Sequence, residues 1–292
     1  MTHNEQVMFQ VWKEAFNEDD DYIEFFLKEG LPLGCTLAPE PPSAQLTLFP
    51  ISFLQEGAAS CQGYYLYGLG ALRSVRGKGW GKILVKRASA HAADMGKQFI
   101  LLQYANDSLR AYYNNLDYNA SIYRSSVQCT RHTLNTSSEE RDYLCYLLSA
   151  IAAPTYHNGP STTATAPHFD RFLWSPQLLE YIRKECLFRK GDVIDNAYCY
   201  PNIDKEGDFL EIKEFTASLQ QIPALIDNIL TRFPHIHRFR FYGKPYPAAT
   251  PEYGQKSFFQ LRQDPFALLH FIDPDLEKRY RPQRSYFALG LD

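Results

Sequence analysis

The spacing of apolar positions predicts two helices and then a series of strands along the first half of the chain. Apolar residues recur at helical spacing over 7–16 and, more briefly, over 23–27. Further on, runs of aromatic and β-branched residues are typical of strands. These predicted strands are 45–54, 63–70, 98–104, 118–128 and 142–148.

Two more amphipathic helices are predicted between the strands. Over 80–95 an apolar stripe includes Leu84, and the stretch stops at Gly96, a residue suited to a helix C-cap. The second helix, over 107–116, is shorter. Strands that alternate with helices predict a mixed α/β sheet with a parallel pair of strands within 63–104.

A change in composition divides the chain. Residues 151–168 are rich in Pro, Gly, Ser, Thr and Ala, which predicts a linker between one domain at 1–150 and another at 169–292. The second part repeats the element order more loosely, so a duplicated architecture is expected. Its predicted elements are helices at 176–189, 219–232 and 265–271 and strands at 193–200, 208–215, 236–242, 256–264 and 283–291.

Composition excludes several classes of protein. With 45% hydrophobic and 22% charged residues among 292, the chain has the composition of a folded globular protein. A formal net charge of -3 gives no reason to expect a nucleic-acid partner. We find neither a run of ~20 apolar residues nor a secretory signal, so we expect a cytoplasmic protein without a membrane partner. Its six cysteines are then expected to be buried free thiols.

Common hydrolase and metal-site motifs are missing from the sequence. His235 and His237 would share one face of a strand, but no third His, Cys or carboxylate stands at ligand spacing. Neither G-x-S-x-G nor H-E-x-x-H occurs, so serine-hydrolase and zinc-protease functions have no support. We therefore expect no metal site.

The most informative feature is a glycine-rich turn between a predicted strand and the helix that begins near residue 80. Such glycines let backbone N–H groups crowd around a ligand, and a helix N-terminus favours negative charge, so a phosphate site is predicted. The spacing fits neither the ATPase P-loop nor the dinucleotide-binding fingerprint. The turn consists of Arg76, Gly77, Lys78, Gly79, Trp80, Gly81 and Lys82.

The spacing Arg-x-x-Gly-x-Gly, formed by Arg76, Gly79 and Gly81, resembles the pyrophosphate loop of the GNAT superfamily of acetyl-coenzyme A-dependent N-acetyltransferases. About thirty residues later, NDSLRAYYNNLDY over 106–118 resembles the family's stretch N-x-x-A-x-x-L-Y-x-K-L-G-F in register. The resemblance covers roughly residues 45–128. Residues that depart from the family's pattern include an aspartate in place of a glycine; among them are Leu109, Asn115, Asp117 and Tyr118.

This resemblance implies an acetyl-coenzyme A site. The strand end at Leu69, Gly70 and Ala71 lies where the family offers backbone groups to the pantetheine arm. Asn106 corresponds to the asparagine that contacts the cofactor region, and Tyr113 corresponds to the tyrosine that usually acts as general acid. Tyr112, its neighbour, is expected to matter mainly for packing.

The two-part layout further resembles GNAT relatives in which an active N-terminal unit is followed by a degenerate GNAT-like unit. The implied fold class is a mixed α/β GNAT fold over 1–150 and a second, GNAT-like mixed α/β domain over 169–292. At the corresponding junction of the second part, around 216–220, the sequence TASLQ contains no equivalent of the glycine motif. Only the first part is therefore expected to bind coenzyme A.

The implied reaction is direct attack of a deprotonated amine on the thioester of acetyl-coenzyme A. Backbone N–H groups near Ala71 would polarise the thioester carbonyl, and Tyr113 would protonate the departing thiolate. The acceptor would be the amine of a small molecule or peptide. Two alternatives remain, a non-catalytic acyl-coenzyme A-binding or sensing module and a related transferase that uses another acyl donor.

The residue that deprotonates the amine is not evident, because residues 63–75 contain no Asp or Glu. The proton could leave through a water chain, a tyrosine hydroxyl within 64–67, Glu29, Asp20 or a carboxylate of the second part. In some two-domain relatives the C-terminal carboxylate reaches the active site. We therefore also hypothesise that Asp292 lies near the site of acetyl transfer.

Overall fold

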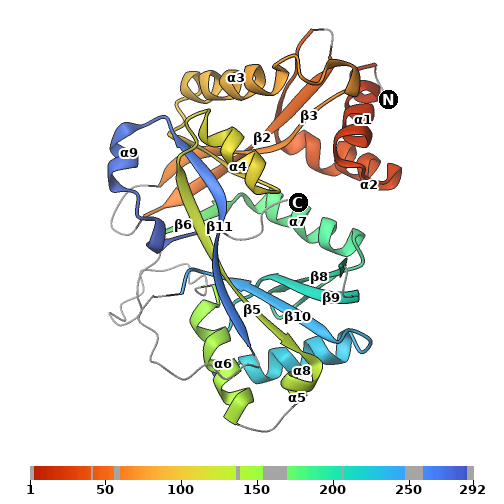
Figure 1. The fold of residues 1–292 in the computed structure, drawn as a ribbon, viewed down its shortest axis with the longest axis vertical. Helices are drawn as coiled ribbons and strands as arrows, with labels where there is room; N and C mark the ends of the chain where they lie inside the picture. The colour runs from red at the N-terminus through yellow and green to blue at the C-terminus, as the bar shows by residue number, and fades with distance from the viewer. Residues whose placement is uncertain are drawn as a thin grey trace.

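A computed structural model describes residues 3–40, 42–55, 60–135, 139–153, 170–204, 207–246 and 259–287. These residues form a mixed α/β fold in which helices pack on a twelve-stranded sheet (Figure 1). The described helices are α1 His3–Phe16, α2 Asp20–Phe25, α3 Trp80–Asp94, α4 Asp107–Asn114, α5 Arg131–Asn135, α6 Glu139–Ile151, α7 Pro176–Phe188, α8 Ile222–Arg232 and α9 Pro274–Arg279. The strands are β1 Cys35–Leu37, β2 Ala44–Leu54, β3 Cys61–Ala71, β4 Phe99–Gln103, β5 Ala120–Thr130, β6 Asp170–Trp174, β7 Asp192–Ile194, β8 Ala197–Asp204, β9 Gly207–Glu214, β10 Arg238–Gly243, β11 Gln260–Phe271 and β12 Ser285–Tyr286.

The sheet is continuous across both parts of the chain. Its strand order is β12-β6-β2-β3-β4-β11-β5-β10-β9-β8-β7, and β1 pairs with β2. β11, from the second part, lies between β4 and β5 and is antiparallel to both. Figure 1 shows β5 and β11 running side by side between the two ends of the molecule. The domain division at 151–168 stays a prediction.

Two strand–helix–strand units occupy corresponding places in this sheet. β3 and β4 pair in parallel and are connected through α3, which confirms the parallel pair predicted within 63–104. β9 and β10 also pair in parallel and are connected through α8. β11 flanks β4 in the first unit, whereas β5 flanks β10 in the second. Each part of the chain thus contributes one strand beside the parallel pair of the other part.

Alternation along β3 explains how the sheet is covered on both faces. Tyr64 and Leu66 belong to a buried cluster with apolar residues of α3, including Leu84. Tyr65 and Tyr67 belong to a second cluster, which includes aromatic residues of α1 and α2. Since successive strand residues point to opposite faces, α3 and the α1–α2 pair cover opposite sides of β3.

Most predicted elements are confirmed, but the strand predicted at 142–148 is wrong because this segment lies within α6. Leu144, Leu148 and Ile151 are buried at a spacing of three to four residues, and acidic residues occupy the first turn of the helix. A short run of branched and aromatic residues occurs in buried helices as well as in strands, so the sequence did not distinguish a helix from a strand here.

The helix predicted at 265–271 is also wrong, because this segment belongs to β11. β11 is paired on both edges, and Phe266, Ala267, Leu268 and Leu269 are all buried. A strand that is covered on both faces loses the alternating pattern that identifies strands. Pro265 is accommodated where the pairing with β5 shifts register.

Among the described residues, no helix is long and apolar enough to cross a membrane. All six cysteines are free, and all except the half-buried Cys35 are buried. The prediction of buried free thiols is therefore confirmed for five of the six.

Candidate active site

A cleft opens where β3 and β4 part. Their parallel pairing runs from Gly63 and Phe99 to Leu66 and Leu102, but β3 continues to Ala71. Beyond Leu66, the β3 edge that faces β4 borders a cleft of about 720 Å³. This volume is within the range of about 300–1,000 Å³ that is usual for sites of small molecules and cofactors.

A β-bulge at Gly68 shapes the cleft. The partner of Tyr67 on β2 is Thr47, whereas Gly70 pairs with Gln45, so β3 has one extra residue over this stretch. Gly68 has a φ of 63°, and a Cβ there would come within 2.9 Å of the Trp12 ring. Glycine is therefore required by both the backbone conformation and the close approach of α1.

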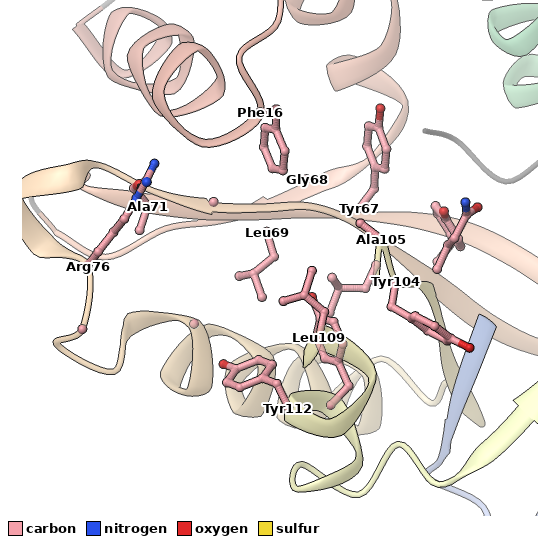
Figure 2. A pocket seen from close by; sticks show the side chains of 17 residues that line it. Phe16, Tyr67, Gly68, Leu69, Ala71, Arg76, Tyr104, Ala105, Leu109 and Tyr112 are labelled. Atoms are coloured by element: carbon pink, nitrogen blue, oxygen red, sulfur yellow. The ribbon is translucent and has the colours of Figure 1, made fainter. Parts of the chain in front are cut away.

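Apolar and aromatic side chains line the cleft on both sides of β3. Figure 2 shows the Tyr67 ring on the side of α1, the same side of β3 as Phe16. Leu69 points to the opposite side, toward Leu109 and Tyr112 of α4. The open edge of β3 is thus accessible from two sides. One ligand could enter along α3 and α4, and a second molecule could approach it from the side of α1.

The glycine turn forms one end of the cleft. Gly77 has a φ of 77° and Gly79 a φ of 82°, and a Cβ at either position would meet no atom within 4 Å. The left-handed backbone, rather than lack of space, favours glycine here. Gly79 is the N-cap of α3, so the free N–H groups of the helix N-terminus lie between Gly77 and Gly81, which both line the cleft.

Arg76 positions the turn through its side chain. Its Nε donates to the Ala71 carbonyl at 3.1 Å, and its Nη2 donates to the Glu14 carbonyl at 2.5 Å. The guanidinium therefore ties the turn to the end of β3 and to α1. Lys78 and Lys82 are exposed beside it and supply further positive charge for an anionic ligand.

The predicted site residues fall into three positions. Residues that line the cleft are Leu69, Gly70, Ala71, Arg76, Gly77, Gly81 and Tyr113. On the turn and the first residues of α3, beyond the lining of the cleft, lie Lys78, Gly79, Trp80 and Lys82. Asn106 caps α4, where its Oδ1 accepts from the Leu109 N–H at 3.0 Å, and it lines an adjoining pocket of about 490 Å³.

Tyr113 is suited to donate a proton. It lies on α4 with 7% of its surface exposed, and it lines the cleft. Burial, followed by the proximity of Tyr112, raises the pKa of the Tyr113 hydroxyl well above its usual range. The hydroxyl consequently keeps its proton at neutral pH.

Tyr112 has a larger place in the site than the sequence indicated. It also lines the cleft, and its hydroxyl lies beside Gly81 at the start of α3. Phe16 and Tyr104 also line the cleft and were not predicted, whereas Tyr67 lies within the range 64–67 that was named for a candidate hydroxyl. The sequence offered two signals for these residues, namely the tyrosines that precede Gly68 and the positions of the other two residues at the ends of α1 and β4. Such signals do not show which side chains face a cavity.

Two candidate bases have partners elsewhere. Glu29 accepts from Lys184 at 2.8 Å, which lowers the pKa of this carboxyl, and Asp20 pairs with Lys13 at 2.8 Å. Asp292 lies outside the described residues. Among the described residues that line the cleft there is no Asp or Glu.

The cleft between parting parallel strands and the glycine turn at a helix N-terminus form the arrangement that the resemblance to the GNAT superfamily implies. Residues 5–118 match the family model of the acetyltransferase (GNAT) family, so this part of the chain is a GNAT acetyltransferase domain. This match supports acyl transfer as the class of reaction. No curated protein sequence matches the chain significantly.

Solved structures show the same fold over most of the chain. A GCN5-related N-acetyltransferase from Anabaena variabilis matches with a TM-score of 0.59 and 13% identity, covering 92% of this chain and 70% of that one. A probable N-acyltransferase from Enterococcus faecalis has a TM-score of 0.57 and 12% identity, with 92% and 70% covered. Eis1 from Mycobacterium abscessus has a TM-score of 0.56 and 12% identity, with 93% and 71% covered.

Within the ranges that the structure describes, no group of three or more His, Cys, Asp and Glu side chains is arranged to hold a metal ion.

Proposed function

We propose that the protein is an N-acetyltransferase that transfers the acetyl group of acetyl-coenzyme A directly to a primary amine. The observation that carries the proposal is the open edge of β3 beside a left-handed glycine turn at the N-terminus of α3. An open strand edge offers backbone hydrogen-bonding groups to the amides of a pantetheine arm, and a helix N-terminus suits a pyrophosphate.

The residues present fit this donor. The turn Arg76–Lys82 combines free N–H groups with exposed cations, and Leu69–Ala71 lines the cleft next to it. Acetyl-coenzyme A supplies an activated acyl group on a thiol leaving group. Backbone N–H groups near Ala71 would stabilise negative charge on the carbonyl oxygen, and the protonated hydroxyl of Tyr113 would neutralise the leaving thiolate.

We also propose that residues 169–292 form a second GNAT-like unit without a coenzyme site. The parallel pair β9–β10 with its connecting α8 supports this, because it repeats the arrangement of β3, α3 and β4. The turn between β9 and α8 has the sequence FTASLQQ and contains no glycine. A cytoplasmic location stays a prediction from the sequence.

Calorimetry with coenzyme A tests the donor site. Gly79→Val should abolish binding, because a β-branched residue cannot readily hold the left-handed conformation at the end of the cleft. Gly96→Val is the matched control, since Gly96 has a φ of 65° with no neighbour within 4 Å but lies at the far end of α3. Unchanged coenzyme A affinity in Gly79→Val would sink the assignment.

Transfer itself is tested with radiolabelled acetyl-coenzyme A and a panel of primary amines. The panel contains phenethylamine, n-hexylamine, spermidine and a lysine-containing peptide, and the expected product is the corresponding N-acetyl amide. Coenzyme A binding without transfer to any panel amine would instead favour the acyl-coenzyme A-binding module.

A further inference from the structure

A buried chain of hydroxyl groups connects the cleft to a carboxylate of the second part of the chain. Tyr67 lines the cleft, and its Oη lies 3.3 Å from the Oη of Tyr22 on α2. The Tyr22 hydroxyl donates in turn to Oε1 of Glu185 on α7 at 3.2 Å. Glu185 is only 3% exposed, so these two hydroxyls link its carboxylate to the cleft.

The direction of these hydrogen bonds follows from the number of protons that each group can donate. An ionised carboxylate only accepts, and a tyrosine hydroxyl has a single proton to donate. Since Tyr22 donates that proton to Glu185, the bond between the two tyrosines requires Tyr67 as the donor. A phenol oxygen has two lone pairs, so a Tyr67 hydroxyl that donates to Tyr22 is also able to accept a proton.

The surroundings of Glu185 stabilise its charge inside the protein. Arg189 donates from Nε to Oε1 at 3.2 Å, and Tyr200 donates to Oε2 at 3.4 Å. The Arg189 guanidinium also pairs with Glu18 at 3.0 Å and lies 3.9 Å from the centre of the Tyr22 ring. Paired and hydrogen-bonded in this way, a buried carboxylate avoids most of the cost of desolvation.

The hydroxyl groups of Tyr67 and Tyr22 lie on the side of β3 from which an acceptor amine would approach. Figure 2 shows Tyr67 on the α1 side, opposite the wall formed by Leu109 and Tyr112, where coenzyme A is proposed to bind. An acceptor amine at neutral pH is mostly an ammonium ion and must lose a proton before it attacks. Burial raises the pKa values of Tyr22 and Tyr67 above the usual value for tyrosine. Both hydroxyls therefore remain protonated at neutral pH and can pass a proton on.

We propose that Tyr67, Tyr22 and Glu185 form a proton relay that deprotonates the acceptor ammonium, an inference that rests on the proposed function. One N–H bond of the ammonium breaks as its proton passes to the Tyr67 oxygen. The Tyr67 proton passes to Tyr22 and the Tyr22 proton to Glu185, which becomes a neutral acid while both hydroxyls are restored. The free amine then attacks the thioester carbonyl.

The remaining protons also balance. When the C–N bond forms and the C–S bond breaks, the nitrogen loses a second proton, which replaces the one that Tyr113 gives to the thiolate. After the products leave, Glu185 returns its proton through the same hydroxyls to water in the open cleft. The net products are an N-acetyl amine, free thiol and one proton.

Four variants test the relay with the panel amine that the wild-type protein acetylates fastest. Tyr22→Phe breaks the chain but keeps a ring that packs against Trp12 and Phe188. Glu185→Gln keeps the shape of the terminal residue and removes the base. Tyr67→Phe removes the hydroxyl of the relay residue that lines the cleft. The matched control is Tyr181→Phe, because Tyr181 is 2% exposed in the same cluster and its hydroxyl is not one of the two that link the cleft to Glu185.

We expect kcat/KM for the amine at pH 7 to fall about 10²–10³-fold in Tyr22→Phe, Glu185→Gln and Tyr67→Phe, as expected for loss of a general base. Tyr181→Phe should stay within about threefold of wild type. As the pH approaches the amine pKa of about 10, the amine loses its proton in solution and the deficit should shrink. The double variant of Tyr22 and Glu185 should be no slower than the slower single variant, because both act in one chain.

The pH profile separates a relay from a packing role. The groups that face Glu185 from the surrounding elements are Tyr67, Tyr22, Tyr181, Cys186, Arg189, Glu18 and Tyr200. A structural defect in this cluster would lower kcat/KM by a constant factor from pH 7 to 9.5, and that result would overturn the relay. So would wild-type rates in Glu185→Gln.

Coenzyme A affinity distinguishes failure of the relay from failure of the proposed function. We expect the three relay variants to bind coenzyme A as tightly as wild type and to retain its melting temperature within a few degrees. A wild-type protein that binds no coenzyme A and acetylates no panel amine would refute the proposed function itself, and the relay with it. If Tyr22→Phe does not fold, Tyr67→Phe and Glu185→Gln still decide the question.

Discussion

The hydroxyl of Tyr112 lies 2.8 Å from the point that a Cβ on Gly81 would occupy. The next atom of the same ring, Cζ, lies at 3.7 Å, an ordinary contact distance. Gly81 thus allows α4 to bring a tyrosine hydroxyl against the first turn of α3. This contact closes the cleft at the end where the glycine turn is located.

We predict that Gly81→Ala weakens coenzyme A binding about tenfold, because Tyr112 must move within the cleft to avoid a clash worth about 1–2 kcal/mol. Alanine is a better helix former than glycine in the first turn of α3, so the melting temperature should not fall. In a Tyr112→Phe background the same substitution should change affinity by no more than about twofold. Calorimetry on the four proteins gives this comparison, and equal losses in both backgrounds would contradict it.

A second prediction assigns the proton donor between two adjacent tyrosines. Tyr113→Phe should lower kcat about 10²–10⁴-fold with little change in coenzyme A affinity, the effect of removing a positioned acid. Tyr112→Phe should act mainly on affinity. Steady-state kinetics together with calorimetry separate the two effects. Wild-type kcat in Tyr113→Phe would transfer the role to Tyr112 or to water.

The sequence predicted the glycine turn, the parallel strands and the order of nearly all elements in the first part because each depends on local spacing. It did not predict that β11 enters the sheet between β4 and β5, since pairing between strands more than one hundred residues apart leaves no local signal. The same limit applies to the cleft. Glu185 lies 163 residues from Tyr22, and only the fold brings the two together.

The turn after α4 shows a departure from the family pattern that the fold accommodates. Asp117 has a φ of 67°, and the N–H of Tyr118 donates to the Tyr113 carbonyl at 3.2 Å, which closes a Schellman-type turn. We predict that Asp117→Gly stabilises the protein by about 0.5–1 kcal/mol, because glycine adopts this conformation without steric cost. Asp117→Ala is the control and should destabilise it. Urea denaturation measures both, and a loss of stability in Asp117→Gly would refute the assignment.

Glu214 gives a prediction about stability and pH. It is 5% exposed at the end of β9, and burial raises the pKa of its carboxyl from 4.5 to about 7. Between these two values the folded protein keeps a proton that the unfolded chain releases, so the stabilising effect of this proton is complete below 4.5 and is lost as the pH rises to 7. At about 1.4 kcal/mol per pH unit, the loss amounts to about 3 kcal/mol.

Glu214→Gln removes this titration while preserving the shape of the side chain. The free energy of unfolding of Glu214→Gln relative to wild type should therefore rise by about 3 kcal/mol across the interval from pH 4.5 to 7, and stay constant above it. Urea denaturation of both proteins at pH 5 and pH 8 measures most of the change. Glu180→Gln, on the exposed side of α7, reports the effect of removing one surface carboxylate. A difference between Glu214→Gln and wild type that does not depend on pH would show that Glu214 is ionised in the folded protein throughout this range.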